Sequence, residues 1–347
     1  MERILISGRD AGDNVQTRAL GEHRVAVSEL GFGAAQLGNL YRTTTDREAT
    51  EAFSTAWETG VRYFDTAPHY GLGLSEKRLG RLLTEHTRDD YVISTKVGRL
   101  LVPTPNPDRK RDEEGFDVPA DYRRVFDLSA QGIRRSVEES LERLGTDRID
   151  ILYLHDPDGF ETEAIETALP ELIRLREQGM VRAVGAGMND SAPLTRFIQE
   201  TDIDVVMVAG RLTLLDQSAL EDLMPAAAAR NISVVAAGVY NSGILGSDTV
   251  VPGANFNYSP AGQDLVTRAS TIADACERHG TSVPAAAIAY PLRFHQVKSV
   301  VLGARTGNQA AGNTERYRKI VPESLWNELE ELGLIPPSPQ NLLEISA

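Results

Sequence analysis

Apolar and polar positions are grouped in blocks along this chain, so that short apolar runs recur and helical patterns follow them. Most of the runs are continuous rather than alternating, which is typical of strands that are covered on both faces. We therefore predict eight buried strands, at residues 28–33, 61–66, 91–96, 150–155, 181–186, 204–209, 232–237 and 297–303.

Helices are predicted where apolar residues recur on one face between these runs. In residues 46–60, Ala49, Phe53 and Trp57 share a face, and Gly60 ends the pattern. Further helices are predicted at residues 75–86, 128–145, 162–179, 264–280 and 283–295.

Eight strand–helix units in 347 residues favour an α/β fold of the (β/α)₈ TIM barrel type. The alternative is an open, doubly wound sheet. A G-x-G-x-x-G motif after an early strand would support that sheet, but "GLGLSEKRLG" has Gly71 and Gly73 without the third glycine at the required place. No linker is visible, so we expect one domain over residues 1–347.

Three segments exceed ordinary loop length. We expect residues 1–27 to close the bottom of the barrel, and residues 99–127 and 246–262 to form long loops over the active site. Residues 109–111 are basic and residues 112–114 acidic, a pattern that is simplest to interpret as part of a solvated, mobile loop.

The composition of the chain narrows the kinds of molecule that it is expected to bind. The formal net charge is −14 with no long basic run, which argues against nucleic acid. The one cysteine, Cys276, cannot form an internal disulfide and has no metal-ligand cluster around it, so we expect a buried side chain and no metal. No stretch has the length of a signal peptide or a membrane span, so we expect a cytoplasmic protein with a small-molecule substrate. Monomer and homo-oligomer both remain open.

Ionisable residues end three consecutive predicted strands: Asp65, Lys96 and His155, and Tyr70 follows the first of these strands. Each has a structural alternative. Asp65 could cap a helix, Lys96 could extend out of the strand end, and the remaining two could simply pack. In a barrel, however, consecutive strand ends converge on one side of the mouth, where active sites lie.

The chemistry of these four groups fits one task. A tyrosine with an ordinary pKa near 10 exchanges protons poorly at neutral pH, and a nearby ammonium lowers that pKa. Asp65 would keep Lys96 charged and in place, Tyr70 would act as general acid or base, and His155 would orient an alcohol or carbonyl oxygen. None of them accepts a hydride, so a cofactor must.

With these residues, the chain resembles the aldo-keto reductase family. The matching runs are "YFDTAPHYG", "VISTKVG" and "ILYLHDPD", and the resemblance extends from residue 18 to residue 313. The runs "VGAGMND", "AGRLTLLDQ" and "AAGVYNSGIL" resemble the branch that contains D-threo-aldose 1-dehydrogenase, L-fucose dehydrogenase, L-galactose dehydrogenase and pyridoxal 4-dehydrogenase. The resemblance implies a (β/α)₈ barrel, a catalytic role for Asp65, Tyr70, Lys96 and His155, and NADP or NAD as cofactor.

The resemblance also implies a set of cofactor contacts, with the 2′-phosphate of NADP at Arg305, since a guanidinium suits phosphate geometry. The alternative for this arginine is a surface residue that caps a helix, and NAD remains possible. Ala237 stands where the family often places an aromatic ring on the nicotinamide, which makes Tyr240 a candidate for that contact. The implied residues are Asn189, Gly238, Val239, Tyr240, Asn241, Gly243, Leu245, Gly303, Ala304, Arg305, Gln309 and Asn313.

The implied activity is oxidation of an aldose of the L-fucose, L-galactose or D-arabinose type at C1 to its lactone, with Tyr70 as the base. Pyridoxal oxidation and general aldehyde reduction are alternatives. A nucleotide-binding regulatory subunit is a third, although a pure binder has no need of Lys96 and Tyr70 together. His69 either lines the substrate pocket or packs in its loop. The sequence leaves open the sugar, the cofactor, the direction of the reaction and the oligomeric state.

Overall fold

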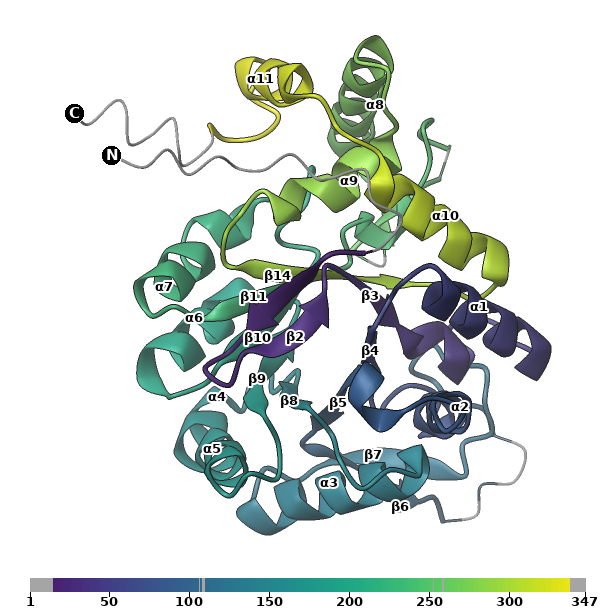
Figure 1. Cartoon of the computed structure of the whole chain (residues 1–347), viewed down its shortest axis with the longest axis vertical. Coiled ribbons are helices and arrows are strands. Elements are labelled where there is room, and N and C mark those ends of the chain that lie inside the picture. The colour runs from purple at the N-terminus through teal and green to yellow at the C-terminus, as the bar shows by residue number, and fades with distance from the viewer. Residues whose placement is uncertain (1–14, 106, 108–109, 252, 258, 338–347) are drawn as a thin grey trace.

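A closed barrel of eight parallel strands forms the centre of the computed structural model, which describes residues 15–105, 107, 110–251, 253–257 and 259–337 (Figure 1). The order around the barrel is β10-β11-β14-β3-β4-β5-β8-β9. All eight predicted strands are confirmed, with ends that differ by at most two residues. They are β3 (Leu30–Gly33), β4 (Tyr63–Asp65), β5 (Val92–Val97), β8 (Ile151–His155), β9 (Ala183–Met188), β10 (Val205–Ala209), β11 (Ser233–Ala237) and β14 (Val297–Gly303).

Helices surround this barrel (Figure 1). Those that correspond to predicted segments are α1 (Asp46–Glu58), α2 (Leu74–Leu83), α3 (Ala130–Leu144), α5 (Leu169–Glu177), α8 (Gln263–Arg278) and α9 (Val283–Leu292). The predicted helix at 162–179 is in fact three pieces, because α4 (Glu161–Glu163) and a π-helical turn (Ala164–Ala168) precede α5. The prediction missed α6 (Ser191–Glu200), α7 (Leu223–Ala229), α10 (Gly307–Arg318) and α11 (Glu323–Glu331).

The β1–β2 hairpin (Thr17–Leu20, Val25–Ser28) packs across the end of the barrel where the strands begin. Its residues Leu20, Val25 and Val27 are buried in one cluster with inward-facing side chains such as Tyr63 and Ile151. Residues 1–14 of the segment that was expected to close the barrel lie outside the described residues.

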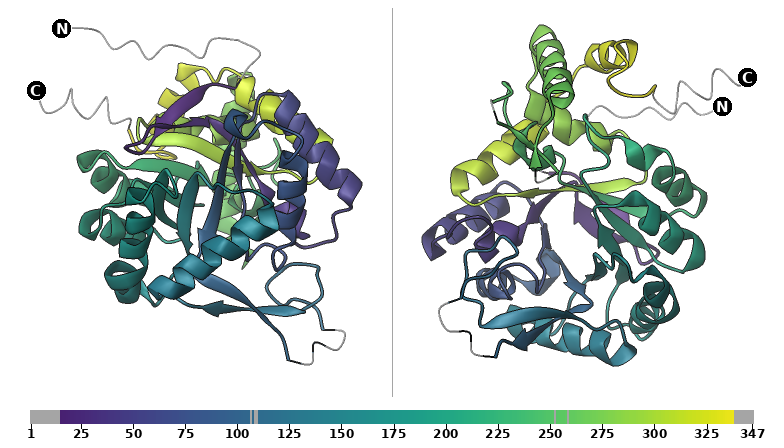
Figure 2. Two further views of the ribbon diagram at one scale, coloured as in Figure 1. Left: turned by 60° about the horizontal axis from the view of Figure 1, so that its bottom comes forward. Right: turned by 180° about the vertical axis from the view of Figure 1, so that it is seen from behind.

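The opposite end of the barrel carries a second hairpin, β6 (Arg99–Pro103) with β7 (Tyr122–Phe126) (Figure 2, left). The expected long loop at 99–127 is therefore a β-hairpin over much of its length. Five residue pairs connect the strands, and Phe116 and Val118 are buried between them and the barrel. Arg109 lies outside the described residues. In the described residues of the segment 246–262, the strands are the short pair β12 (Asn255–Phe256) and β13 (Ser259–Pro260).

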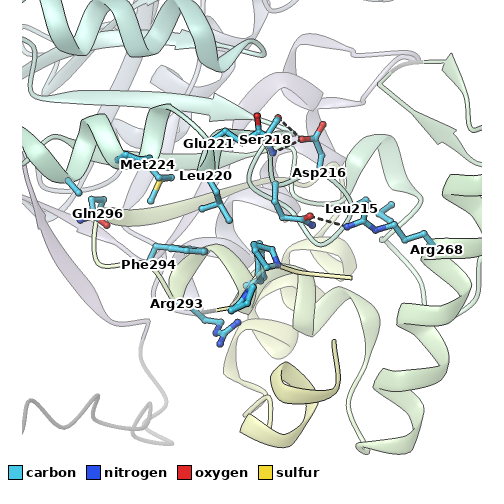
Figure 3. A pocket seen from close by; sticks show the side chains of 16 residues that line it. Leu215, Asp216, Ser218, Leu220, Glu221, Met224, Arg268, Arg293, Phe294 and Gln296 are labelled. Carbon is cyan, nitrogen blue, oxygen red and sulfur yellow. Dashed lines mark hydrogen bonds between the residues drawn. The ribbon is translucent and has the colours of Figure 1, made fainter. Parts of the chain in front are cut away.

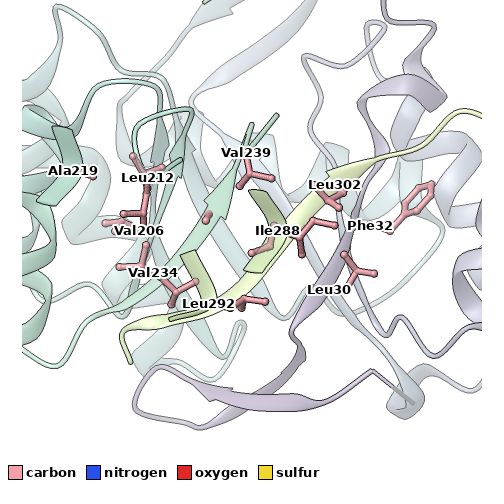
Figure 4. Close-up of a cluster of buried hydrophobic side chains, with 14 of the residues drawn as sticks. Leu30, Phe32, Val206, Leu212, Ala219, Val234, Val239, Ile288, Leu292 and Leu302 are labelled. Atoms are coloured by element: carbon pink, nitrogen blue, oxygen red, sulfur yellow. The ribbon is translucent and has the colours of Figure 1, made fainter. Parts of the chain in front are cut away.

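The main core lies between the strands and the helices around them (Figure 4). Leu30 and Phe32 of β3, Val206 of β10 and Val234 of β11 point outward from the barrel into this layer, where Ile288 of α9 meets them. Residues between them point into the barrel, which has its own buried cluster. Both faces of each strand are thus buried, and this explains the continuous apolar runs. Cys276 is buried in α8.

Candidate active site

The four ionisable residues singled out in the sequence lie together where the barrel strands end. Asp65 is the last residue of β4, Lys96 is the last but one of β5, and His155 is the last of β8. These strands are neighbours in the barrel, so their ends meet on one side of the mouth. Tyr70 lies in the turn between β4 and α2.

A buried ion pair occupies the floor of this site. Lys96 Nζ lies 2.7 Å from Asp65 Oδ2 and donates a second hydrogen bond of 2.9 Å to the carbonyl of Thr66. Lys96 is 2% exposed and Asp65 is 3% exposed. Burial by itself lowers the pKa of Lys96, but the charge of Asp65 and the adjacent phenol of Tyr70 outweigh it, so that this pKa is raised. The lysine is therefore a permanent cation.

Tyr70 lies between this cation and His155. The Lys96 ammonium is 4.9 Å from the centre of the Tyr70 ring, and the rings of Tyr70 and His155 are 5.9 Å apart and perpendicular. The charge of Lys96 acts on the phenol of Tyr70, and each group shifts the pKa of the other.

The expected low pKa of the Tyr70 phenol is not what this structure shows. Burial disfavours the phenolate more than Lys96 favours it, and the pKa of Tyr70 is raised to about 12. The difference has a physical reason. The neighbouring ammonium could be anticipated from the sequence, but the desolvation of the Tyr70 phenol could not. Lys96 still acts in the expected direction, because it holds the pKa below the value that burial alone would give.

Two glycines hold the Tyr70 turn against the barrel. Gly71 has a left-handed backbone (φ +64°), and a Cβ at this position would lie 2.2 Å from the carbonyl oxygen of Gly38. A Cβ on Gly38 would in turn lie 2.6 Å from the carbonyl carbon of Tyr70. Only glycine at both positions permits this approach, which places the phenol beside Lys96.

Both histidines of the site are neutral at physiological pH. Burial, followed by the nearby cations Lys96 and Arg99, lowers the pKa of His155 well below its ordinary value. Burial and Arg124 lower the pKa of His69 to about 3. The Nδ1 atoms of both rings are buried and have no hydrogen-bond partner among the described residues. A neutral imidazole can donate from one nitrogen and accept at the other, which suits the orientation of a hydroxyl group.

A hydrogen-bonded chain below the ion pair was missed in the sequence. Ser94 Oγ lies 2.6 Å from Asp65 Oδ1 and 3.0 Å from the hydroxyl of Tyr63, which lies 3.2 Å from the hydroxyl of Tyr153. The sequence did contain a signal. Each of these residues lies two positions before Asp65, Lys96 or His155, and residues two apart on a strand share a face.

A cavity of about 590 Å³ opens above these residues. Every barrel strand contributes to its wall from its carboxyl end, through Gly33, Asp65, Lys96, His155, Met188, Ala209, Ala237 and Gly303. Outside the strands, the β6–β7 hairpin adds Glu114 and Phe116, and Asp156 follows β8. Glu114 Oε2 lies 3.6 Å from His69 Nδ1, and Asp156 Oδ2 lies 3.0 Å from Arg99. His69 lines this cavity, which supports a place in the pocket wall rather than simple packing in its loop.

A second cavity of about 470 Å³ adjoins the first and shares Gln36, Tyr41, Gly238, Val301 and Gly303 with it. The two form one elongated cleft. Seven of the twelve predicted cofactor residues line it: Asn189, Gly238, Val239, Tyr240, Asn241, Gly243 and Gly303. Leu245, Ala304, Arg305, Gln309 and Asn313 are not on its walls.

Some of these placements differ from the expectation. Tyr240 lines the second cavity rather than the one with Tyr70, and its hydroxyl lies 3.5 Å from Asn313 Oδ1. It therefore does not face the catalytic residues. Gln309 and Asn313 belong to helix α10 and not to a loop. Asn313 donates to the carbonyl of Gly303 at 3.3 Å and so holds the end of β14 against this helix.

The placement of Arg305 does not support the phosphate-binding role that favoured NADP. Its guanidinium donates to the carbonyls of Leu40 and Arg42 and to the hydroxyl of Thr44. It is 8% exposed. Arg305 thus fastens the loop after β3 to the end of β14, and this contact uses three of its five N–H donors. The sequence could not indicate this, because the acceptors lie more than 260 positions away.

Two unpartnered oxygens indicate where a polar ligand fits in the cleft. Gln36 Oε1 and Asn241 Oδ1 are buried and accept no hydrogen bond from the described residues. The wall near them is formed by small residues, Ala209, Ala237 and Gly238, which leave room for a flat ring. Gln36 was missed in the sequence, although it lies three positions after the end of β3, near a strand end as the catalytic candidates do. These features fit an elongated cofactor with amide and hydroxyl groups.

In the described ranges, no group of three or more His, Cys, Asp or Glu residues is arranged to hold a metal ion. None of the helices in the same ranges has the length and apolar character to cross a membrane.

Comparison with known proteins gives consistent matches. The profile of the aldo/keto reductase family matches residues 29–333. D-threo-aldose 1-dehydrogenase of a Pseudomonas species is 46% identical over 90% of this chain and 96% of its own length. Pyridoxal 4-dehydrogenase of Microbacterium luteolum is 34% identical over 92% of this chain and 98% of its own length. The fold is similar to that of an aldo-keto reductase from Bacillus halodurans, with a TM-score of 0.73, 24% identity, and coverage of 92% of this chain and 96% of that one.

Proposed function

Because this chain belongs to the aldo/keto reductase family, a family of oxidoreductases, we propose that it oxidises a neutral aldose at C1 to the lactone, with NAD or NADP as hydride acceptor. The 46% identity with a D-threo-aldose 1-dehydrogenase over nearly the whole of both chains supports this substrate class. In the reaction the C1 hydrogen leaves as hydride and the proton of the anomeric hydroxyl goes to the protein.

The observation that carries the proposal is the buried Asp65–Lys96 pair beside Tyr70, with a neutral His155 across from it. Tyr70 is protonated at neutral pH, so it first releases its own proton to water in the cavity; the phenolate, which Lys96 stabilises, then takes the hydroxyl proton. His155 hydrogen-bonds the same substrate oxygen and orients it. Asp65 holds the ammonium at the distance where it acts on the phenol.

The elongated cleft supports a nicotinamide cofactor. Asn189 and Gln36 offer amide groups, and the backbone from Gly238 to Gly243 lines the second cavity. The bound nicotinamide supplies the hydride acceptor, which no side chain can be. Arg305 gives no preference for NADP in its observed position, so both cofactors belong in the assay.

The walls of the first cavity support a substrate with several hydroxyl groups. Glu114 and Asp156 face it from two elements, and a carboxylate accepts hydrogen bonds from sugar hydroxyls. Each carboxylate is paired with an arginine, Asp156 with Arg99 and Glu114 with Arg124, so they offer acceptors to a neutral substrate without a net negative charge. A second candidate is pyridoxal: the Phe116 ring forms part of the same wall, and the relative with 34% identity is a pyridoxal 4-dehydrogenase.

The test is the absorbance of the reduced nicotinamide, with NAD or NADP and a panel of L-fucose, L-galactose, D-arabinose, L-glucose and pyridoxal. We expect turnover with one of the sugars, and we expect Tyr70→Phe to lower kcat by at least about a hundredfold. The matched control is quenching of protein fluorescence by NADP, which Tyr70→Phe should leave unchanged. Turnover with pyridoxal alone would favour the second candidate. Cofactor binding without turnover on any substrate would contradict a dehydrogenase.

A further inference from the structure

A third cavity, of about 840 Å³, lies on the flank of the barrel and shares no lining residue with the catalytic cleft (Figure 3). It is bounded by the loop after β10, helix α7, the end of α9 and the segment that follows α11. Its volume is in the range of pockets that hold small organic ligands. The proposed dehydrogenase chemistry makes no use of it.

The walls of this flank cavity are mainly apolar. Leu220 and Met224 lie on one side and Phe294 on the other (Figure 3), and Pro336 also lines the cavity. A ligand with an apolar part of about ten carbon atoms would contact both of these walls.

The phenol of Tyr290 marks a polar point inside this apolar space. Tyr290 is 1% exposed and lines the cavity, and its hydroxyl has no hydrogen-bond partner among the described residues. A buried hydroxyl without a partner is unfavourable, and such groups usually pair with a ligand or an ordered water. Its ring packs edge-on against Phe294, so its position does not depend on the hydroxyl.

Arg268 supplies a cation at the same cavity. It comes from α8, and its guanidinium donates to Gln217 Oε1 at 3.0 Å and to the carbonyl of Leu334 (Figure 3). Both acceptors are neutral. In the described part of the chain no carboxylate forms an ion pair with it, and its buried Nε has no acceptor. A half-buried cation with only neutral partners favours an anion.

The acidic side chains around the cavity are engaged elsewhere or lie at its rim. Asp216 accepts from the backbone N–H of Ser218 at 3.0 Å and lies 3.4 Å from Arg211. Glu221 is exposed. The other arginine of the cavity, Arg293, lies 3.4 Å from Glu330. Arg268 is thus the cation that remains for a ligand.

We propose that the flank cavity binds an amphipathic monocarboxylate. Its carboxylate pairs with the Arg268 guanidinium and accepts a hydrogen bond from the Tyr290 hydroxyl, and its apolar chain lies between Met224 and Phe294. The site is separate from the proposed active site, so that its occupancy can be measured without turnover.

The test uses decanoate as the probe, with isothermal titration calorimetry on the full chain. We expect saturable binding below about 1 mM, and weaker binding of at least about tenfold in Tyr290→Phe, which loses one charge-assisted hydrogen bond. Because that hydroxyl has no partner in the protein, the variant should melt no lower than wild type without decanoate.

A pair of helix variants provides the steric control. Ala228 lines the cavity and Ala229 does not, although both are exposed on α7. Ala228→Trp should abolish decanoate binding and Ala229→Trp should retain it, and both should keep the dehydrogenase activity of wild type. Three results would overturn the proposal: no saturable binding, equal binding of 1-decanol, or binding that neither Tyr290→Phe nor Ala228→Trp weakens.

Discussion

The Asp65–Lys96 pair allows a test that separates catalysis from stability. Replacement of Asp65 by asparagine keeps the shape of the side chain and removes its charge. The hydrogen bond to Ser94 can form with either residue, but Lys96 then retains only neutral partners, such as the carbonyl of Thr66. Both members of the pair are almost completely buried, so water cannot replace the lost counterion.

The distance between the two charges sets the magnitude. At 2.7 Å and an effective dielectric constant of about 20, their attraction is roughly 6 kcal/mol. Part of this is offset by the cost of burying both ions. Removal of one partner from a buried pair typically costs about 3–5 kcal/mol. With an unfolding entropy of about 2.1 cal/mol/K per residue, this corresponds to a fall in Tm of about 4–7 °C for this chain.

The assay is calorimetric unfolding of Asp65→Asn, Lys96→Met and the double variant, with initial rates on the same preparations. Each single variant should lose about 3–5 kcal/mol, because each leaves one buried charge unpaired. The double variant has no buried charge and should be about 2–3 kcal/mol more stable than the sum of the single effects predicts. Activity should not return with stability, because the double variant has no ammonium to stabilise the Tyr70 phenolate. We expect all three to lose at least about a hundredfold in kcat/KM.

Two results would refute this reasoning. Unfolding of Asp65→Asn within about 1 °C of wild type would mean that Lys96 finds solvent or another partner. Strictly additive effects on Tm would mean that the two side chains do not act as a pair.

Three further predictions follow from individual contacts. Thermal unfolding should show that Gly71→Ala destabilises the protein by a few kcal/mol more than Gly145→Ala. Both glycines have φ near +64°, but of the two only an added Cβ at Gly71 would lie within 4 Å of other backbone atoms. Equal effects would contradict the close approach of Gly71 to Gly38. His69 has a pKa of about 3 in the folded state and about 6.5 in the unfolded state, so its contribution to stability is complete above pH 6.5 and is lost as the pH falls toward 3. In His69→Gln the fall in Tm between pH 6.5 and pH 3 should therefore be shallower than in wild type. An unchanged slope would count against a buried neutral ring. Arg305→Gln should lower the Tm and should change the ratio of the KM for NADP to the KM for NAD by less than about threefold. A selective rise of tenfold or more in the KM for NADP would mean that this arginine binds the 2′-phosphate.

Much of the fold could be predicted because its information is local. A strand such as Val92–Val97 is buried on both faces, and its residue pattern records this without reference to the rest of the chain. The helices that were missed show where local information ends. Residues 223–229 form a seven-residue helix with four alanines, and a segment so short is helical because it packs and not because of its own propensity.

The catalytic residues could be located because strand ends are a topological fact. Once eight parallel strands are expected, Asp65, Lys96 and His155 must meet at one end of the barrel, and the resemblance to aldo-keto reductases rests on the same residues. The resemblance itself is confirmed by the family match over residues 29–333. The role of each residue in turnover stays a prediction until the variants are measured.

The sequence by itself determined the barrel, the family and the positions at which charged groups reach its mouth, because periodicity and order along the chain encode these. Only the tertiary structure decided how each group behaves. Burial of Tyr70 outweighs its neighbouring cation, the acceptors of Arg305 come from a loop at the other end of the chain, and Glu114 reaches the cavity on a hairpin. Desolvation and long-range hydrogen bonds depend on which surfaces meet in three dimensions, and a linear pattern does not contain that information.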